Sequence, residues 1–154
     1  MRWGGGLHFD AVTGLGGSLP IDGDDGVAGT RASEAMLAAL GACAGSDVAS
    51  ILVKKRQPLT SYEVLVRGVQ GDEHPRVFET IDVLHVVTGD GVDPEAVRRS
   101  VELSATRYCV VTAQLSSGDV VMRHRCRVGD GPEVDVAETG PHGRIVVHQH
   151  AHEA

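Results

Sequence analysis

Three cysteines, Cys43, Cys109 and Cys126, are the side chains of this sequence best suited to covalent chemistry. A thiolate is a strong nucleophile that oxidises reversibly, whereas a buried neutral thiol acts as a small hydrophobic group. Cys43 and Cys109 are 66 positions apart (109 − 43), so their spacing does not place them together. From the residues alone, a reactive pair and two buried core residues both remain open.

Asp47 is the charged residue nearest to Cys43 along a predicted helix. Because it follows Cys43 by four positions, the two side chains should share a helix face. A carboxylate there disfavours the thiolate unless a cation intervenes. Asp47 can instead bind a backbone group, so a chemical role and a structural role both stay open.

Cys126 lies in the alternating segment RHRCRV. In a strand, this alternation places Arg123, Arg125 and Arg127 on one face and Cys126 on the other, with His124. We therefore predict that Cys126 is buried and has no redox role.

Two segments contain possible metal ligands at the spacing that metal sites use, but we predict a functional metal site in neither. The segment HQHAH, with His148, His150 and His152, can bind Zn²⁺, Ni²⁺ or Cu²⁺ when extended, but it also reads as a solvated tail. The acidic loop at 22–29 resembles part of a calcium loop without its later bidentate glutamate. No metal is therefore expected among the site residues.

The stretch 31–56 is predicted to be one long helix that carries Cys43 at its centre. Its apolar residues recur at helical spacing: Met36, Leu37, Leu40, Ala44, Val48, Ile51 and Leu52. Pro58 stops the helix. Glycine inside a helix costs about 1 kcal/mol relative to alanine, so Gly41 and Gly45 indicate close approach by another backbone. The helix should therefore be central and buried.

The remaining segments complete an α+β fold with an antiparallel sheet packed on that helix. Strands are predicted at 62–69, 77–88 and 120–128, a hairpin from 2–9 and 17–21, a helix from Asp93 to about Thr106, and a short helix at 110–115 with Cys109 near its start. Residues 129–143 look like a loop or flexible tail, and residues 145–147 could add an edge strand.

Length and composition narrow the class of protein. A chain of 154 residues suggests one domain. The net charge of −7 and the 3% aromatic content argue against a nucleic-acid partner. By inspection, no apolar run approaches the roughly 20 residues needed to span a bilayer, and no signal-peptide core is visible. We therefore expect a cytoplasmic protein without a membrane partner.

Two cysteine segments, EAMLAALGACAGSDVASILVKKR and ELSATRYCVV, make the chain resemble the OsmC/Ohr family. The resemblance covers residues 2 to about 128, which predicts an OsmC-like domain at 1–128 and a partly flexible extension at 129–154. It implies an intertwined homodimer, in which sheets from both chains wrap two central helices. Such packing of the two helices would account for Gly41 and Gly45.

The resemblance also implies the activity of a thiol-dependent peroxidase that acts on organic hydroperoxides in the oxidative stress response. Cys43 would attack the peroxide and become a sulfenic acid, and Cys109 would condense with it to a disulfide. An external dithiol, lipoyl or thioredoxin-like, would reduce that disulfide, and no resident cofactor is expected. Glu34 is expected in the catalytic set. The expected substrate contacts are Arg31, Met36, Leu40 and Asp47.

The sequence departs from the peroxidase pattern in two places. The family's arginine comes from an N-terminal strand or loop, where this chain offers Arg2 and Arg31. The family's glutamate lies ten residues before the first cysteine, where this chain has Ser33, with Glu34 one position later. The alternatives are a dimeric protein that binds a small apolar or sulfur-containing ligand without catalysis, and a metal handler that uses HQHAH.

Overall fold

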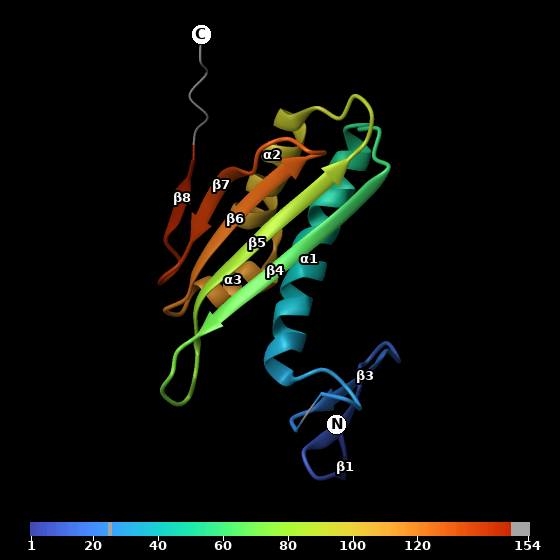
Figure 1. Ribbon diagram of the computed structural model, residues 1–154, viewed down its shortest axis with the longest axis vertical. Helices are drawn as coiled ribbons and strands as arrows, with labels where there is room; N and C mark the ends of the chain where they lie inside the picture. Colours follow the sequence, from blue (N-terminus) through green and yellow to red (C-terminus); the bar gives the residue numbers. More distant parts are fainter. Residues whose placement is uncertain (25, 149–154) are drawn as a thin grey trace. The chain divides into compact units, whose positions relative to one another are not determined.

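The computed structural model describes residues 1–24 and 26–148 (Figure 1). The chain divides into two compact units, residues 1–39 and the remainder from Leu40 onward. One domain over residues 1–128 was predicted. That domain boundary stays a prediction.

The first unit contains a three-stranded antiparallel sheet. Its strands are β1 (Arg2–Gly5), β2 (His8–Val12) and β3 (Ser18–Asp22), in that order. A single hairpin was predicted, but the chain already reverses within residues 2–9. The reversal uses Gly5 and Gly6, with φ of 109° and 52°, a region that favours glycine.

Helix α1 (Ala32–Lys54) confirms the predicted long helix to within two residues at each end. Glu34 caps the N-terminus of α1: its Oε2 accepts a hydrogen bond from the backbone N–H of Arg31 at 3.2 Å. A glutamate three residues into a helix reaches back to the cap residue in this way. In the second unit, the buried residues of α1 are Leu40, Gly41, Ala44, Gly45, Val48 and Leu52.

The length and apolar composition of α1 are also sufficient for a membrane span, so the expectation that no segment would qualify was wrong. The core helix of a globular domain passes the same test. Here Val48 and Leu52 pack in the core of the second unit. Of the most apolar window of α1, 28% is buried, so this packing accounts for part of its apolar residues.

The glycines of α1 face the chain's own strand β4 (Ser61–Gln70). A Cβ on Gly41 would lie 3.0 Å from Val66 Cγ2, and one on Gly45 would lie 3.1 Å from Val64 Cγ2. Close approach by another backbone was predicted, but the nearest atoms are valine side chains on a strand of the same chain. The two glycines therefore do not require a partner helix, and the homodimer stays a prediction.

The second unit is built on a five-stranded sheet in the order β4-β5-β6-β7-β8. Strand β5 (Phe78–Thr88) pairs with β4 in antiparallel fashion and with β6 (Val121–Val128) in parallel. The sheet is therefore mixed, whereas an antiparallel sheet was predicted. The helical segments between β5 and β6 cause the difference. A connection of that length can carry the chain back to the start of the sheet, so that β6 runs in the same direction as β5.

Strand β7 (Val134–Thr139) lies inside the stretch predicted as loop or tail. It pairs with β6, and β8 (Ile145–Val147) pairs with β7 as the predicted edge strand. Val136 in β7 is fully buried. The loop prediction for 129–143 was therefore wrong over Val134–Thr139. Glycine, proline and acidic residues on both sides of this short strand are typical of loops, and they led to that prediction.

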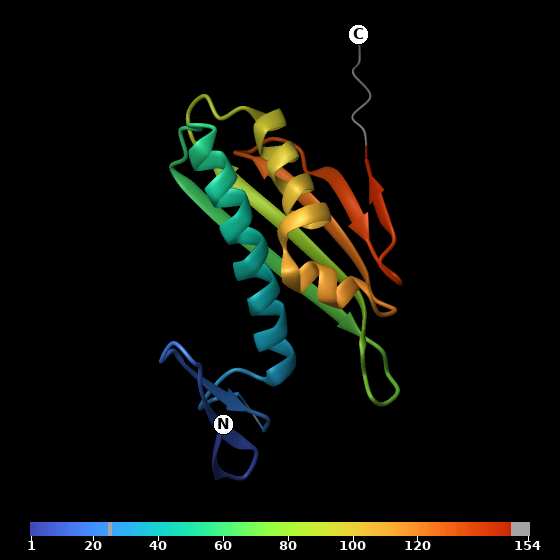
Figure 2. The ribbon, with the colours of Figure 1, turned by 180° about the vertical axis from the view of Figure 1, so that it is seen from behind.

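Helices α1 and α2 (Pro94–Leu103) cover one face of the five-stranded sheet (Figures 1 and 2). The core between them and the sheet contains Val48, Leu52, Val87, Val92, Ala96, Val97, Val101, Cys126 and Val136. This arrangement confirms the α+β class. It also places α1, which carries Cys43, on the same face of the sheet as α2, after which the chain continues to Cys109.

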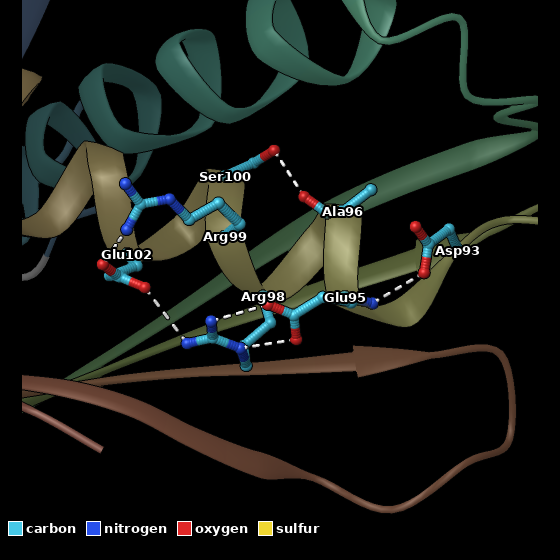
Figure 3. Close-up of polar contacts among 7 residues, drawn as sticks. All are labelled: Asp93, Glu95, Ala96, Arg98, Arg99, Ser100 and Glu102. Carbon is cyan, nitrogen blue, oxygen red and sulfur yellow. Dashed lines mark hydrogen bonds and ion pairs between the residues drawn. The ribbon is translucent and has the colours of Figure 1, made fainter. Parts of the chain in front are cut away.

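The start of α2 follows the predicted capping pattern (Figure 3). Asp93 Oδ1 accepts a hydrogen bond from the Glu95 backbone N–H at 3.0 Å, and Pro94 begins the helix. One turn later, the Arg98 guanidinium pairs with Glu95 at 2.7 Å and with Glu102 at 3.1 Å. These pairs tie together successive turns of α2.

Candidate active site

Cys43, Asp47 and Cys109 meet in the second unit. Their sulfur and carboxylate oxygen atoms all lie within 4.8 Å of one another. Cys43 and Asp47 come from successive turns of α1, as their spacing predicted. The fold supplies Cys109, which the sequence could not place next to Cys43.

A π-helical segment, η1 (Ser104–Tyr108), joins α2 to Cys109. The Cys109 N–H donates to the Ser104 carbonyl at 3.0 Å, five residues back. The Ser104 hydroxyl donates to Asp47 Oδ2 at 3.1 Å. The π turn therefore directs both Ser104 and Cys109 at the site, and such turns recur at functional sites. Sequence reasoning missed Ser104, because no residue pattern marks a π turn.

Cys109 is the buried member of the pair and caps helix α3 (Val110–Ser116). Its Sγ accepts a hydrogen bond from the Thr112 backbone N–H at 3.3 Å. Burial raises the pKa of the Cys109 thiol, the Thr112 hydrogen bond opposes that rise, and contact with Cys43 adds to it. Cys109 is therefore held as a neutral thiol beside the half-buried Cys43.

A buried polar pair lies beside Asp47, on the helix-covered face of the sheet. The Tyr62 hydroxyl and His85 Nδ1 are 2.7 Å apart and hydrogen-bonded. Burial raises the pKa of Tyr62, and the Asp47 charge raises it further. Burial lowers the pKa of His85 to about 3, so both groups are uncharged at neutral pH. The sequence reasoning did not single out Tyr62 or His85, whose only signal is a polar residue at a core-facing strand position.

The other predicted site residues lie in different surroundings. Glu34 caps α1, and Arg31 donates to the Asp24 carbonyl at 3.4 Å within the first unit. Met36 is 39% exposed and Leu40 is fully buried.

Asp47 is the charged member of this group of three side chains. Within the described residues of the second unit, 40–148, no arginine or lysine makes a hydrogen bond or ion pair with Cys43, Asp47 or Cys109. Arg2 and Arg31, the two candidates for the family arginine, both belong to the first unit.

Cys126 is buried in the core, as predicted. Burial raises its pKa to about 11, so its thiol stays protonated at neutral pH. His124 lies on the same face, and its Nε2 is 3.0 Å from the Thr139 hydroxyl. Of the HQHAH histidines, His148 is exposed and follows β8, whereas His150 and His152 lie outside the described residues.

The protein is thus an α+β protein with two neighbouring free cysteines. One lies on the long helix that covers the mixed five-stranded sheet, and the other is brought beside it by the fold. The chain belongs to the OsmC family: the model of the OsmC-like protein family matches residues 23–124. Protein YhfA of Escherichia coli K12 is 36% identical over 115 residues, which cover 75% of this chain and 86% of YhfA.

Solved structures share the fold of this chain. A hypothetical protein from Aquifex aeolicus VF5 has a TM-score of 0.71 at 26% identity, covering 84% of this chain and 94% of that one. The organic hydroperoxide resistance protein OhrB of Bacillus subtilis has a TM-score of 0.53 at 20% identity, covering 80% and 93%. At that identity OhrB supports the fold alone. The OsmC-like fold predicted from the sequence is confirmed.

Proposed function

We propose that this protein is a thiol-dependent peroxidase of the OsmC/Ohr type that reduces organic hydroperoxides. The observation that carries the proposal is the approach of Cys43 and Cys109 within 4.8 Å, from positions far apart in the sequence. A second sulfur so close to the first can capture a sulfenic acid before it oxidises further.

The reaction divides between the two sulfurs according to their exposure. Cys43, which is half-buried, is the sulfur that a substrate can reach. Its thiolate attacks one peroxide oxygen, the O–O bond breaks, and an alcohol leaves after taking up a proton. Cys43 is then a sulfenic acid, and Cys109 condenses with it to form a disulfide and water. An external dithiol restores both thiols and is itself oxidised to a disulfide.

The surroundings of Cys43 argue for slow turnover. The Asp47 carboxylate lies beside both sulfurs, and Ser104 satisfies one of its oxygens. A negative charge there repels the negative charge that the attacking sulfur and the departing alkoxide carry during the reaction. Replacing Asp47 with asparagine should therefore speed the first oxidation of Cys43.

Further parts of the proposal follow from the family assignment. They are a homodimer in the cytoplasm, a lipoyl or thioredoxin-like dithiol as reductant, and no membrane or nucleic-acid partner. The roles predicted for Glu34 in catalysis and for Arg31, Met36 and Leu40 in substrate binding also stay proposals. The contact of Glu34 with the start of α1 supports an indirect role through that helix.

Mass spectrometry after one equivalent of cumene hydroperoxide tests the chemistry. We expect a Cys43–Cys109 disulfide in the parent, no oxidation at position 43 in Cys43→Ser, and added oxygen on Cys43 in Cys109→Ser. Cys126→Ala is the matched control and should behave as the parent. An unoxidised Cys43 at every pH would contradict the peroxidase proposal and favour the ligand-binding alternative.

A further inference from the structure

We infer that Cys43, Asp47 and Cys109 together form a binding site for a thiophilic divalent cation, with Zn²⁺ as the reference ion. The site uses residues of the proposed peroxidase centre, but metal binding needs no peroxidase activity. Peroxide chemistry and metal binding can therefore fail separately.

The donor atoms fit zinc in type and number. Two sulfurs and one carboxylate oxygen leave the fourth position of a tetrahedral ion open. With Zn–S near 2.3 Å, two thiolates on a tetrahedral ion are about 3.8 Å apart, and a thiolate and a carboxylate oxygen about 3.5 Å apart. The observed limit of 4.8 Å requires the two sulfurs to close by about 1 Å at most, and each sulfur–oxygen pair by about 1.3 Å at most. Side-chain rotation of Cys43 and Asp47, both only half-buried, can supply that movement.

Surrounding groups orient two of the three ligands. The Ser104 hydroxyl donates to Asp47 Oδ2, a contact that fixes the orientation of the carboxylate beside the two sulfurs. The Thr112 N–H donates to Cys109 Sγ, a contact that stabilises a thiolate ligand. Hydrogen bonds to ligand atoms of this kind strengthen metal sites.

The negative charge of the three ligands also favours a bound cation. In their ligand forms the two thiolates and the carboxylate carry three negative charges. Within the described residues of the second unit, no arginine or lysine makes a hydrogen bond or ion pair with them. A divalent cation would neutralise part of this negative charge and displace one proton from each thiol. The carboxylate that hinders peroxide attack thus becomes a ligand.

Metal binding and disulfide formation exclude each other at this site. A disulfide between Cys43 and Cys109 joins the two sulfurs and removes both thiolates, so the oxidised protein should release the ion. A bound ion, in turn, should slow the oxidation of Cys43, because it occupies the sulfur lone pair that attacks the peroxide.

The test is an anaerobic Co²⁺ titration of the reduced, full-length protein, followed by displacement with Zn²⁺. Thiolate coordination produces an intense near-ultraviolet charge-transfer band, which histidine and carboxylate ligands do not produce. The histidines of HQHAH therefore cannot imitate the signal. A variant with His148, His150 and His152 replaced by alanine serves as a second control.

We expect one equivalent of Co²⁺ to generate the band in the parent, in Cys126→Ala and in the histidine variant. Cys43→Ser and Cys109→Ser should each lose about half of its intensity and bind more weakly. Ser104→Ala should weaken binding on the order of 10-fold, and Asp47→Asn by more. Prior oxidation to the disulfide should abolish the band.

Three results would overturn the inference: no band at stoichiometric Co²⁺, a band that survives unchanged in Cys43→Ser, or a band lost in Cys126→Ala. Asp47→Asn separates this inference from the peroxidase proposal, because it should weaken metal binding while speeding oxidation of Cys43. Unchanged Co²⁺ affinity in Asp47→Asn would remove the carboxylate from the site and refute the three-residue cluster.

Discussion

The buried histidine His124 should make the stability of this protein fall steeply in mild acid. Burial lowers its pKa from 6.5 to about 4. The unfolded chain therefore takes up a proton on this residue near pH 6.5, whereas the folded chain resists until about pH 4. Because the unfolded state binds more protons between these values, stability is present in full above pH 6.5 and falls as the pH is lowered.

The size of the effect follows from the shift. A difference of 2.5 pKa units, at about 1.4 kcal/mol per unit, corresponds to about 3 to 4 kcal/mol in the free energy of unfolding. Most of that should be lost between pH 7 and pH 4. His85, whose pKa burial lowers to about 3, acts in the same direction.

A variant isolates the contribution of His124 from that of the other acidic and basic groups. His124→Gln keeps an amide that can bond to the Thr139 hydroxyl but cannot titrate. Urea unfolding at pH 7 and pH 4 should show the parent losing about 3 kcal/mol more than the variant. The exposed control His74→Gln should lose as much as the parent. Equal losses in the parent and His124→Gln would refute the burial argument.

Three further outcomes are expected. Gly41→Leu should lower the free energy of unfolding by about 1–3 kcal/mol, because its side chain meets Val66 of the same chain; unchanged urea unfolding would contradict the close packing of α1 on β4. Cys126→Val should leave hydroperoxide consumption unchanged, and lost turnover in a folded variant would show a redox role. Asp93→Ala should cost about 1 kcal/mol in thermal unfolding, because it removes the hydrogen bond to the Glu95 N–H; an unchanged melting temperature would mean that the cap adds nothing.

Local patterns in the sequence were enough to predict most helices and strands. The apolar stripe of 31–56 predicted α1, and Asp93-Pro94 predicted the start of α2, because capping and periodicity depend on residues a few positions apart. The alternation in RHRCRV predicted that Cys126 is buried. The small residues at Gly41 and Gly45 predicted a close neighbour without identifying it as β4.

Tertiary structure alone decided which strands pair and which residues meet at the site. The parallel pairing of β5 with β6 depends on the path of the crossover, and β7 gains its strand conformation from pairing with β6. Cys109 reaches Cys43 because η1 turns the chain by a π-helical step that has no residue signature. The same turn directs Ser104 at Asp47. The sequence by itself therefore determined the reactive residue types and the helix that carries Cys43, whereas long-range packing decided which side chains meet there.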